Sequence, residues 1–285
     1  MRQLLILSGK GGTGKTTVAS AFVKLSEAKA LADCDVDAPN LHLVMNYTKS
    51  PVINDYYGMK KAKIDNNKCT QCGLCIENCR FGSISENYKV NIYDCEGCGV
   101  CEYICPSSAI SLTDFKAGDL ILYNDGAVFS TAELKMGSGN TGKLVSEVKK
   151  QLRENTNTDF AVIDGSPGIG CPVIASISGV SMVLIITEPS VSGISDMERI
   201  IETARKFKTK VAVCINKYDI NKNNSDKIEN YCKNYNIELT GKIPFDMKAV
   251  EAINNGLTII DIDCAAKRAV QEVYKNTIKI LNDQE

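Results

Sequence analysis

A glycine-rich loop near the start of the chain constrains the fold more than any other feature of the sequence. The segment Gly9-Lys10-Gly11-Gly12-Thr13-Gly14-Lys15-Thr16 satisfies the pattern G-x-x-x-x-G-K-[ST]. An apolar run at 3–8 precedes the loop, and residues 18–29 after it have helical periodicity. Glycines let backbone N–H groups curl around phosphate oxygens, and a helix N-terminus adds partial positive charge there. The sequence therefore predicts a phosphate-binding loop between a buried strand and a helix.

Two side chains of this loop add chemistry to its backbone. In loops of this pattern the lysine, here Lys15, reaches the β- and γ-phosphates, and the hydroxyl of Thr16 ligates Mg²⁺. The alternative is a glycine-rich turn with an accidental Lys-Thr pair, which the flanking strand and helix argue against. The predicted nucleotide-binding residues of the loop are Gly11, Gly12, Thr13, Gly14, Lys15, Thr16 and Thr17.

Strands and helices alternate along most of the remaining chain. Apolar runs predict strands at 160–163, 182–186 and 211–215, and helical patterns follow each of them. One of these helices is expected to begin at Ser195, because Glu198 three residues later completes a capping box. This alternation predicts an α/β fold with a mostly parallel sheet and helices on both faces.

Eight of the thirteen cysteines lie in one short region, in two runs with the same spacing. The spacing C-x₂-C-x₂-C-x₃-C, followed by Pro in the second run, is that of bacterial two-cluster ferredoxins. Three thiolates of each run bind one [4Fe–4S] cubane and the fourth binds the other. The expected ligands are therefore Cys69, Cys72, Cys75 and Cys105 for one cluster, and Cys79, Cys95, Cys98 and Cys101 for the other.

Zinc is the alternative for these cysteines, since Cys₄ zinc sites also use C-x₂-C pairs. Two quartets of closely spaced cysteines do not follow the two-pair zinc pattern. Arg80 stands where the first run usually has Pro, which removes no ligand. Because the cysteine region interrupts the α/β alternation, we expect an inserted ferredoxin-like domain at 59–114, between two parts of a nucleotide-binding domain at 1–58 and 115–285.

The string from Lys10 to Thr17 resembles the deviant Walker A loop of the MinD/ParA and nitrogenase iron-protein superfamily. The resemblance implies that Lys10 crosses a dimer interface to the phosphates of the other subunit, and hence a nucleotide-dependent homodimer. It implies that Asp35 positions the attacking water. It also implies that Asp164, which opens the string DGSPGIG, holds Mg²⁺ as a Walker B aspartate does. With Lys15, these residues are the catalytic candidates.

Recognition of the base is expected from two later segments. The string from Asn216 through Lys217 to Asp219 literally matches N-K-x-D, the guanine-reading motif of GTPases, which leaves GTP as an alternative. In MinD-like proteins a similar asparagine contacts adenine, and a proline-centred segment, resembled here around Pro244, follows downstream. The resemblance therefore favours ATP, with Asn216, Lys217 and Pro244 at its site.

From residue 5 to about 252 the chain resembles MinD-superfamily ATPases that contain an inserted ferredoxin domain. This implies an ATPase whose nucleotide-driven dimer switching controls electron transfer through two [4Fe–4S] clusters to a redox or iron–sulfur partner protein. The alternative is an ATP-dependent iron–sulfur cluster carrier like the Mrp-type scaffold ATPases, although no C-x-x-C pair lies outside the two runs. A spatial regulator like MinD is disfavoured, because the final helix lacks bulky membrane-inserting residues.

Charge and hydropathy exclude other classes. The formal net charge is −1 and Trp is absent, which argues against a nucleic-acid-binding surface. The longest apolar runs, such as 182–186, are too short to cross a bilayer, and no targeting segment is visible. We therefore expect a cytoplasmic protein, whose cysteines bind metal rather than form disulfides. Cys171 is interpreted as a small packed residue, and the alternative is a third, partial metal centre shared with a dimer mate. The single histidine, His42, is interpreted as a surface or packing residue.

Overall fold

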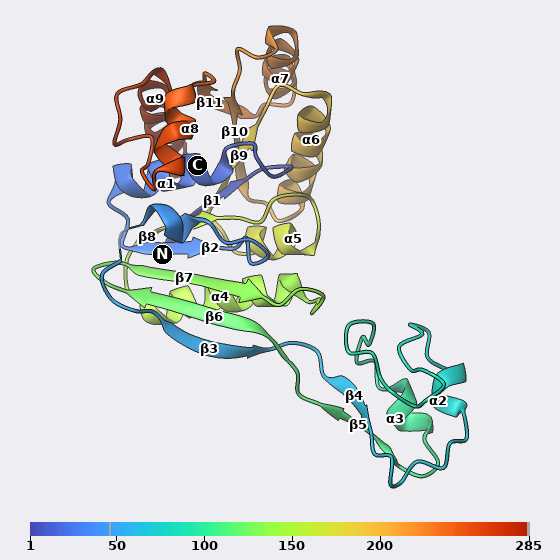
Figure 1. The fold of residues 1–285 in the computed structure, drawn as a ribbon. Helices are drawn as coiled ribbons and strands as arrows, with labels where there is room; N and C mark the ends of the chain where they lie inside the picture. The colour runs from blue at the N-terminus through green and yellow to red at the C-terminus, as the bar shows by residue number, and fades with distance from the viewer. Residues whose placement is uncertain (46, 284–285) are drawn as a thin grey trace. The chain divides into compact units, whose positions relative to one another are not determined.

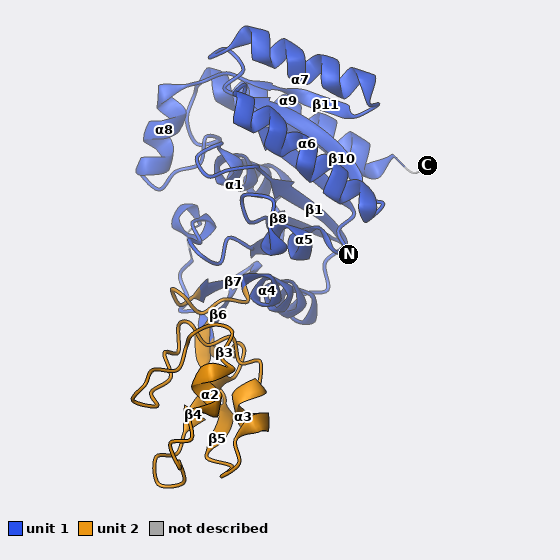
Figure 2. Ribbon diagram, turned by 90° about the vertical axis from the view of Figure 1, so that its right-hand side faces the viewer, with its two compact units in different colours: residues 1–53, 120–133, 141–285 blue, residues 54–119, 134–140 orange. Residues whose placement is uncertain are grey.

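The computed structural model describes residues 1–45 and 47–283, and the chain divides into two compact units (Figure 2). Unit 1 consists of Met1–Ile53, Leu120–Glu133 and Thr141–Glu285. Unit 2 consists of Asn54–Asp119 and Leu134–Asn140, and it contains the whole cysteine region.

A nine-stranded sheet dominates the fold, with the strand order β11-β10-β9-β1-β8-β2-β7-β6-β3. All neighbouring pairs from β11 to β7 are parallel, which confirms the α/β fold predicted from the alternation of strands and helices. The strands are β1 (Arg2–Leu7), β2 (Ala30–Asp33), β3 (Val52–Tyr57), β6 (Lys116–Asn124), β7 (Val128–Leu134), β8 (Phe160–Asp164), β9 (Met182–Thr187), β10 (Lys210–Asn216) and β11 (Glu238–Ile243).

Helices cover both faces of this sheet in unit 1 (Figure 1). On one face lie α1 (Lys15–Ser26) and α9 (Ala265–Asn282), which contact each other. The opposite face carries α4 (Thr141–Asn155), α5 (Cys171–Ile177), α6 (Val191–Lys206) and α7 (Lys222–Asn234). A 3-10 turn at Leu41–Val44 and helix α8 (Met247–Asn254) lie in connections of the same unit.

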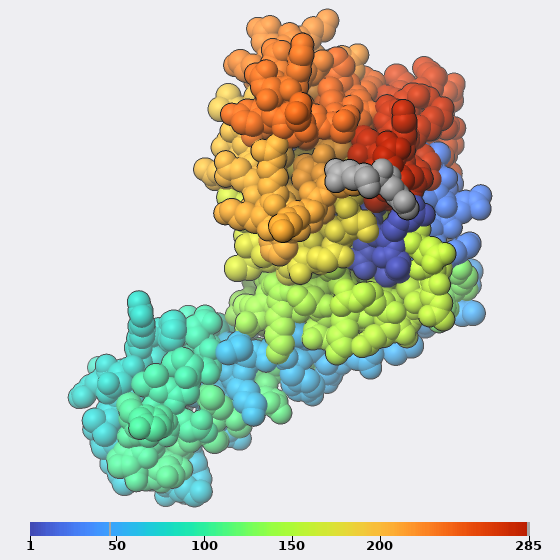
Figure 3. Space-filling model, turned by 180° about the vertical axis from the view of Figure 1, so that it is seen from behind, coloured from blue at the N-terminus to red at the C-terminus, as the bar shows by residue number. Residues whose placement is uncertain are grey.

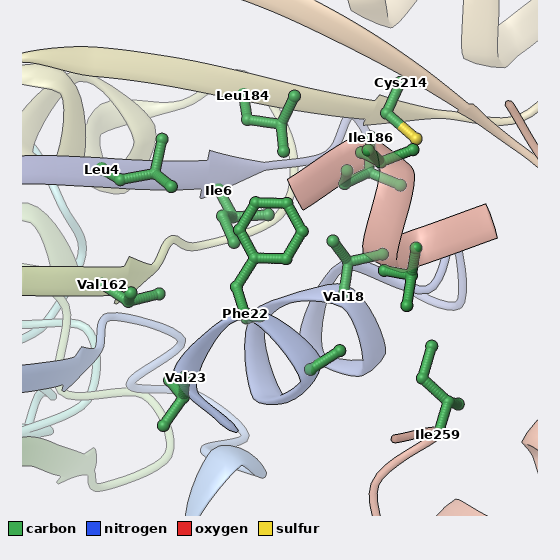
Figure 4. Close-up of a cluster of buried hydrophobic side chains, with 14 of the residues drawn as sticks. Leu4, Ile6, Val18, Phe22, Val23, Val162, Leu184, Ile186, Cys214 and Ile259 are labelled. Atoms are coloured by element: carbon green, nitrogen blue, oxygen red, sulfur yellow. The ribbon is translucent and has the colours of Figure 1, made fainter. Parts of the chain in front are cut away.

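The main core forms where α1 packs on the sheet. Leu4 and Ile6 alternate along β1 and meet Val18 and Phe22 of α1, and all four side chains are at most 1% exposed (Figure 4). Full burial of one such side chain stabilises the fold by about 1.5–3 kcal/mol. This packing holds the N-terminus of α1 at the end of β1, so the loop 8–14 between them is short and constrained.

The predicted start of one helix was wrong. Helix α6 begins at Val191, not at Ser195, because Ser190 is its N-cap and accepts a hydrogen bond from the backbone N–H of Gly193 at 3.0 Å. Ser195 lies in the second turn, where the helix already satisfies its backbone groups. The earlier serine competes successfully because it lies three residues after the end of β9 and its backbone is extended.

Unit 2 contains the short helices α2 (Leu74–Glu77) and α3 (Val100–Ile104) and a two-stranded antiparallel sheet of β4 (Lys61–Ile64) and β5 (Ile110–Thr113). Its two halves repeat one arrangement. Ile64 pairs with Ile110 in the sheet, and Val90 pairs with Ile84 in an isolated bridge. Each pair joins the residue five before one cysteine run to the residue five after the last cysteine of the other run. The geometry therefore follows the duplication of the sequence.

The two described ends of the chain meet in unit 1. The Arg2 guanidinium donates a hydrogen bond to the Asn282 side chain, and dark-blue N-terminal atoms adjoin the red C-terminal helix in Figure 3. Among the described residues, no helix combines the length and the apolar character that crossing a membrane requires.

Candidate functional site

Six neighbouring parallel strands end at the same edge of the sheet, and a polar or loop residue of interest lies at or just after the end of each of them. In the order β11-β10-β9-β1-β8-β2, the segments at these ends are Pro244, Asn216, Glu188, the loop 8–14, Asp164 and Asp33. Ligands of open α/β sheets bind outside the carboxyl ends of the strands. The topology thus gathers at one edge residues that are up to 235 positions apart, from residue 9 to residue 244.

The conformation of the glycine-rich loop depends on its contact with Asn216 at the end of β10. The side-chain amide of Asn216 donates to the carbonyl oxygen of Thr13 at 2.7 Å. A Cβ at Gly14, where φ is 93°, would lie 2.3 Å from that same amide nitrogen, so only glycine fits here. The predicted base-reading residue Asn216 therefore also supports the loop that precedes α1.

Lys15 and Thr16, the first residues of α1, both contact Asp164 at the end of β8. The Lys15 ammonium lies 2.6 Å from one carboxylate oxygen, and the Thr16 hydroxyl donates to the other at 2.7 Å. Burial alone would lower the pKa of Lys15, but the carboxylates of Asp164, Asp33 and Asp35 outweigh it and raise that pKa. The lysine is thus held as a cation beside the predicted magnesium-binding aspartate.

Asp33 and Asp35 lie at the end of β2, next to Asp164, to which Asp33 is paired in register. Asp33 is fully buried and accepts backbone N–H bonds from Asp35, Asn40 and Leu41, each at 3.0 Å. Burial, followed by the charge of Asp164, raises the pKa of Asp33 to about 7. Burial also raises the pKa of the half-buried Asp35. Asp33 therefore orders the loop that carries Asp35.

Lys10 contacts a residue that the sequence analysis did not identify. Its ammonium lies 2.5 Å from one carboxylate oxygen of Glu188, which follows β9, while Lys217 lies 3.6 Å from the other oxygen. The two lysines outweigh the effect of burial and lower the pKa of Glu188. The signal available in the sequence for Glu188 was a carboxylate that follows a predicted strand, because ligands bind at the carboxyl ends of such strands.

A cavity of about 220 Å³ opens beside the loop. Three predicted base-site residues, Asn216, Lys217 and Pro244, line it together with Gly12, Gly14 and apolar side chains of α1, α8 and the segment after β11. Asp219, the last residue of the N-K-x-D match, accepts the backbone N–H of Phe245 in the cavity wall at 2.8 Å. Its carboxylate is therefore engaged by the protein's own backbone.

In unit 2 the cysteines group by position in the fold. Cys79 of the first run lines the same hollow as Cys95, Cys98 and Cys101 of the second run. Cys69 and Cys72 lie close enough to Cys75 for their charges to act on its thiol. The described residues contain no group of three or more His, Cys, Asp or Glu side chains gathered around one point to hold a single metal ion. A cubane instead spreads four thiolates over four irons.

Hydrogen bonds also reach the sulfurs of the fourth cysteines of both runs. Ser83 lies 3.2 Å from the Cys79 sulfur, and the backbone N–H of Ala109 donates to Cys105 at 3.3 Å. Burial alone would raise the pKa of both thiols. The Ser83 hydroxyl at Cys79, the Ser107 hydroxyl at Cys105 and nearby backbone N–H groups outweigh burial and lower both pKa values. Donors aimed at sulfur stabilise the thiolate, which is the form that binds metal.

Two further expectations have different outcomes. Cys171, interpreted as a packed residue, is exposed at the start of α5, because the helix begins there and leaves its first residue uncovered. His42 lies in the 3-10 turn after the Asp35 loop and is partly exposed.

Comparison with known proteins gives a family and a fold. The family described as "CobQ/CobB/MinD/ParA nucleotide binding domain" matches residues 4–259. An uncharacterized protein of Methanocaldococcus jannaschii is 31% identical over 276 residues, which cover 96% of this chain and 95% of that protein. An iron-sulfur cluster carrier protein of Pyrococcus horikoshii is 24% identical over 312 residues, covering 99% and 87%. The septum site-determining protein MinD of Pyrococcus horikoshii, complexed with Mg-ADP, superposes with a TM-score of 0.61 at 18% identity, covering 99% and 97%.

Proposed function

Because the chain belongs to the CobQ/CobB/MinD/ParA family of nucleotide-binding domains, we propose that it is an ATPase with two [4Fe–4S] clusters, whose nucleotide state controls electron transfer. The observation that carries the proposal is the presence of two complete constellations in one chain. One is the set of phosphate- and magnesium-binding side chains at the strand ends of unit 1. The other is the pair of cysteine quartets in unit 2.

ATP is the nucleotide that the cavity beside the loop favours. Asn216 lines the cavity, and one carboxylate oxygen of Asp219, the residue that a guanine-reading site would use, accepts the backbone N–H of Phe245. The MinD structure with the similar fold holds Mg-ADP, an adenine nucleotide. The apolar wall around Pro244 suits the face of a purine base.

The catalytic roles follow from the charges at the strand ends. Lys15 would move from Asp164 to the phosphates, and Thr16 and Asp164 would then hold Mg²⁺. Asp35, which is half-buried near Lys15 and Asp164, would orient the attacking water. Lys10 would leave Glu188 and reach the nucleotide of a second subunit, which makes the proposed active form a homodimer.

The segment 59–114 is proposed as an inserted ferredoxin-like domain. Cys79 lines one hollow with Cys95, Cys98 and Cys101, which is the ligand set that the doubled spacing predicts for one cluster. The matching set is Cys69, Cys72, Cys75 and Cys105. When bound, the clusters supply one-electron redox chemistry. The chain itself contributes thiolates and the hydrogen bonds that stabilise them.

A second candidate function is an ATP-dependent carrier of iron–sulfur clusters. It is favoured by the relatives named iron-sulfur cluster carrier proteins in Pyrococcus horikoshii and Pyrococcus abyssi. Against it stands the number of ligands, since four cysteines for each cluster leave no open coordination position for transfer. Cys171 is an exposed thiol outside the two quartets and is the residue on which a carrier would rely.

The test is anaerobic analysis of iron, sulfide and EPR signals in the purified full-length protein. Samples are then incubated with an apo-ferredoxin, with and without Mg-ATP. About eight irons per chain that stay bound through cycles of reduction and oxidation support the electron-transfer proposal. ATP-stimulated loss of iron to the acceptor overturns it in favour of the carrier.

Two variants sharpen this experiment. Lys15→Ala removes the cation that meets the phosphates and serves as the control without nucleotide binding. Cys171→Ser changes an exposed thiol that lies outside both quartets. If cluster transfer requires ATP and Cys171, the carrier function holds. If iron stays bound in the presence of the acceptor, in the unaltered protein and in both variants, with and without Mg-ATP, the clusters are resident groups.

A further inference from the structure

The only cation buried near the cysteine runs, among the described residues of unit 2, is Lys61 at the start of β4. Its side chain is 5% exposed, and its ammonium donates to the backbone carbonyl of Cys95 at 2.6 Å. The same ammonium lies 5.7 Å from the ring centroid of Phe115, a cation–π contact. A buried charge needs polar partners that replace its hydration. For Lys61 these are the carbonyl dipole of Cys95 and the ring of Phe115.

The backbone beside Lys61 is packed just as closely against the second cysteine run. The N–H of Ala62 points to the sulfur of Cys95 at 3.5 Å. A Cβ at Gly97 would lie 2.1 Å from the carbonyl oxygen of Lys60, so glycine is needed between the first two cysteines of this run. The start of β4 is therefore held against the loop that contains Cys95, with the Lys61 ammonium at the backbone carbonyl of that cysteine.

The duplication provides an internal comparison. Lys61 is eight residues before Cys69, and the residue eight before Cys95 is Asn87, which is neutral and exposed. Next to Asn87, Tyr88 stands where Ala62 stands in the other half, and its phenol donates to the carbonyl of Gln71 at 2.6 Å. The first run thus receives a neutral hydroxyl where the second receives an ammonium.

This asymmetry has a consequence that rests on the proposed two-cluster function. Reduction adds one negative charge to a cluster, and a buried cation favours that charge because the protein interior screens it weakly. We propose that Lys61 gives the cluster of Cys79, Cys95, Cys98 and Cys101 the higher reduction potential of the two. One electron delivered to the pair by an external one-electron donor then resides on this cluster. Exchange within the pair oxidises one cluster and reduces the other, with no further reactant.

The test is an anaerobic potentiometric titration of the full-length protein, followed by EPR. Lys61→Met keeps the apolar stem and removes the charge. We expect it to lower the higher of the two reduction potentials by about 59 mV, which is a tenfold change in the equilibrium constant for a one-electron reduction. The other potential should not change. Lys63→Met is the matched control, because Lys63 is an exposed lysine of the same strand. Equal small shifts in both variants overturn the proposal.

A second variant keeps the test decisive if Lys61→Met does not fold. Lys61→Gln removes the charge but keeps an amide that can donate to the Cys95 carbonyl oxygen. It is expected to lower the higher potential and to narrow the gap between the two clusters, while a fall of the lower potential instead contradicts the proposal. Two clusters with indistinguishable potentials in the unaltered protein also overturn it. Absence of iron and sulfide is a different result, because it refutes the proposed two-cluster function itself.

Discussion

At the scale of single residues, burial gives the acidic side chains at the strand ends properties that a surface carboxylate lacks. Asp33 is 0% exposed beside Asp164, whereas Asp37, four residues later in the same loop, is exposed. The raised pKa of Asp33 means that its ionisation opposes folding in the nucleotide-free protein. Its three backbone N–H contacts offset this cost and order the loop of Asp35.

The raised pKa of Asp33 predicts a pH dependence of stability. Between pH 3.8 and about 7 the folded chain holds a proton at Asp33 that the unfolded chain has released, so the free energy of unfolding falls as pH rises. The Asp33→Asn variant has no carboxyl group here, so its free energy of unfolding should not show this decrease. Between pH 5 and pH 8 its free energy of unfolding should therefore rise by on the order of 2–3 kcal/mol relative to that of the unaltered protein. Urea denaturation of the nucleotide-free protein at both pH values measures the difference. Asp37→Asn is the control: its difference in free energy of unfolding from the unaltered protein should be the same at both pH values.

At the scale of elements, one buried lysine joins α4 to the end of α5. The Lys149 ammonium donates to the carbonyl oxygens of Ala175, Ser176 and Ser178, at 3.2, 2.6 and 2.6 Å. These carbonyls end α5, where the helix dipole is negative and where no further helical N–H groups are available. Since α5 follows directly on the DGSPGIG segment, this contact supports the segment that contains Asp164.

Removal of this cap is expected to destabilise unit 1. Lys149→Met fits the apolar space but leaves buried carbonyl oxygens without donors, which costs about 2–3 kcal/mol in the free energy of unfolding. The adjacent Lys150 is exposed, and Lys150→Met should change the free energy by less than about 0.5 kcal/mol. Denaturant titration separates the two variants. A Lys149→Met protein as stable as the control would show that the three contacts contribute nothing net.

At the scale of the whole molecule, the proposed active form is a dimer that depends on Lys10. In the single chain Lys10 is 40% exposed, and Glu188 holds it away from its expected position on a second subunit. A cation supplied to developing phosphate charge is worth 10³–10⁵ in rate in related phosphoryl transfer. The same side chain therefore has two alternative partners, one within the chain and one across the proposed interface.

This arrangement predicts how Lys10→Ala behaves. The variant should still bind Mg-ATP, because the loop backbone, Lys15 and Thr16 are unchanged. Its rate of ATP hydrolysis should fall by about 10³ or more, and ATP should no longer produce a dimer in analytical ultracentrifugation. Lys143→Ala, a change of an exposed lysine in α4, is the control for loss of surface charge. Hydrolysis by Lys10→Ala within threefold of the control would exclude a role for Lys10 at the phosphates.

The sequence by itself determined the features that depend on local spacing. The glycine pattern, the hydrophobic alternation and the doubled cysteine spacing each describe residues close together in the chain, so the α/β fold and the candidate ligands were predictable. The spacing could not show where α6 begins, since Ser190 and Ser195 both have capping chemistry and only the end of β9 selects the first.

Only the tertiary structure decided the contacts between distant residues. Glu188 meets Lys10 because β9 and β1 are neighbours in the sheet, although 178 residues separate the two side chains. Likewise, Lys61 precedes the first cysteine run but contacts Cys95 of the second, because β4 packs across the duplicated halves. Such pairings depend on the order of strands, and strand order is set by the packing of the whole core and leaves no local signal in the sequence.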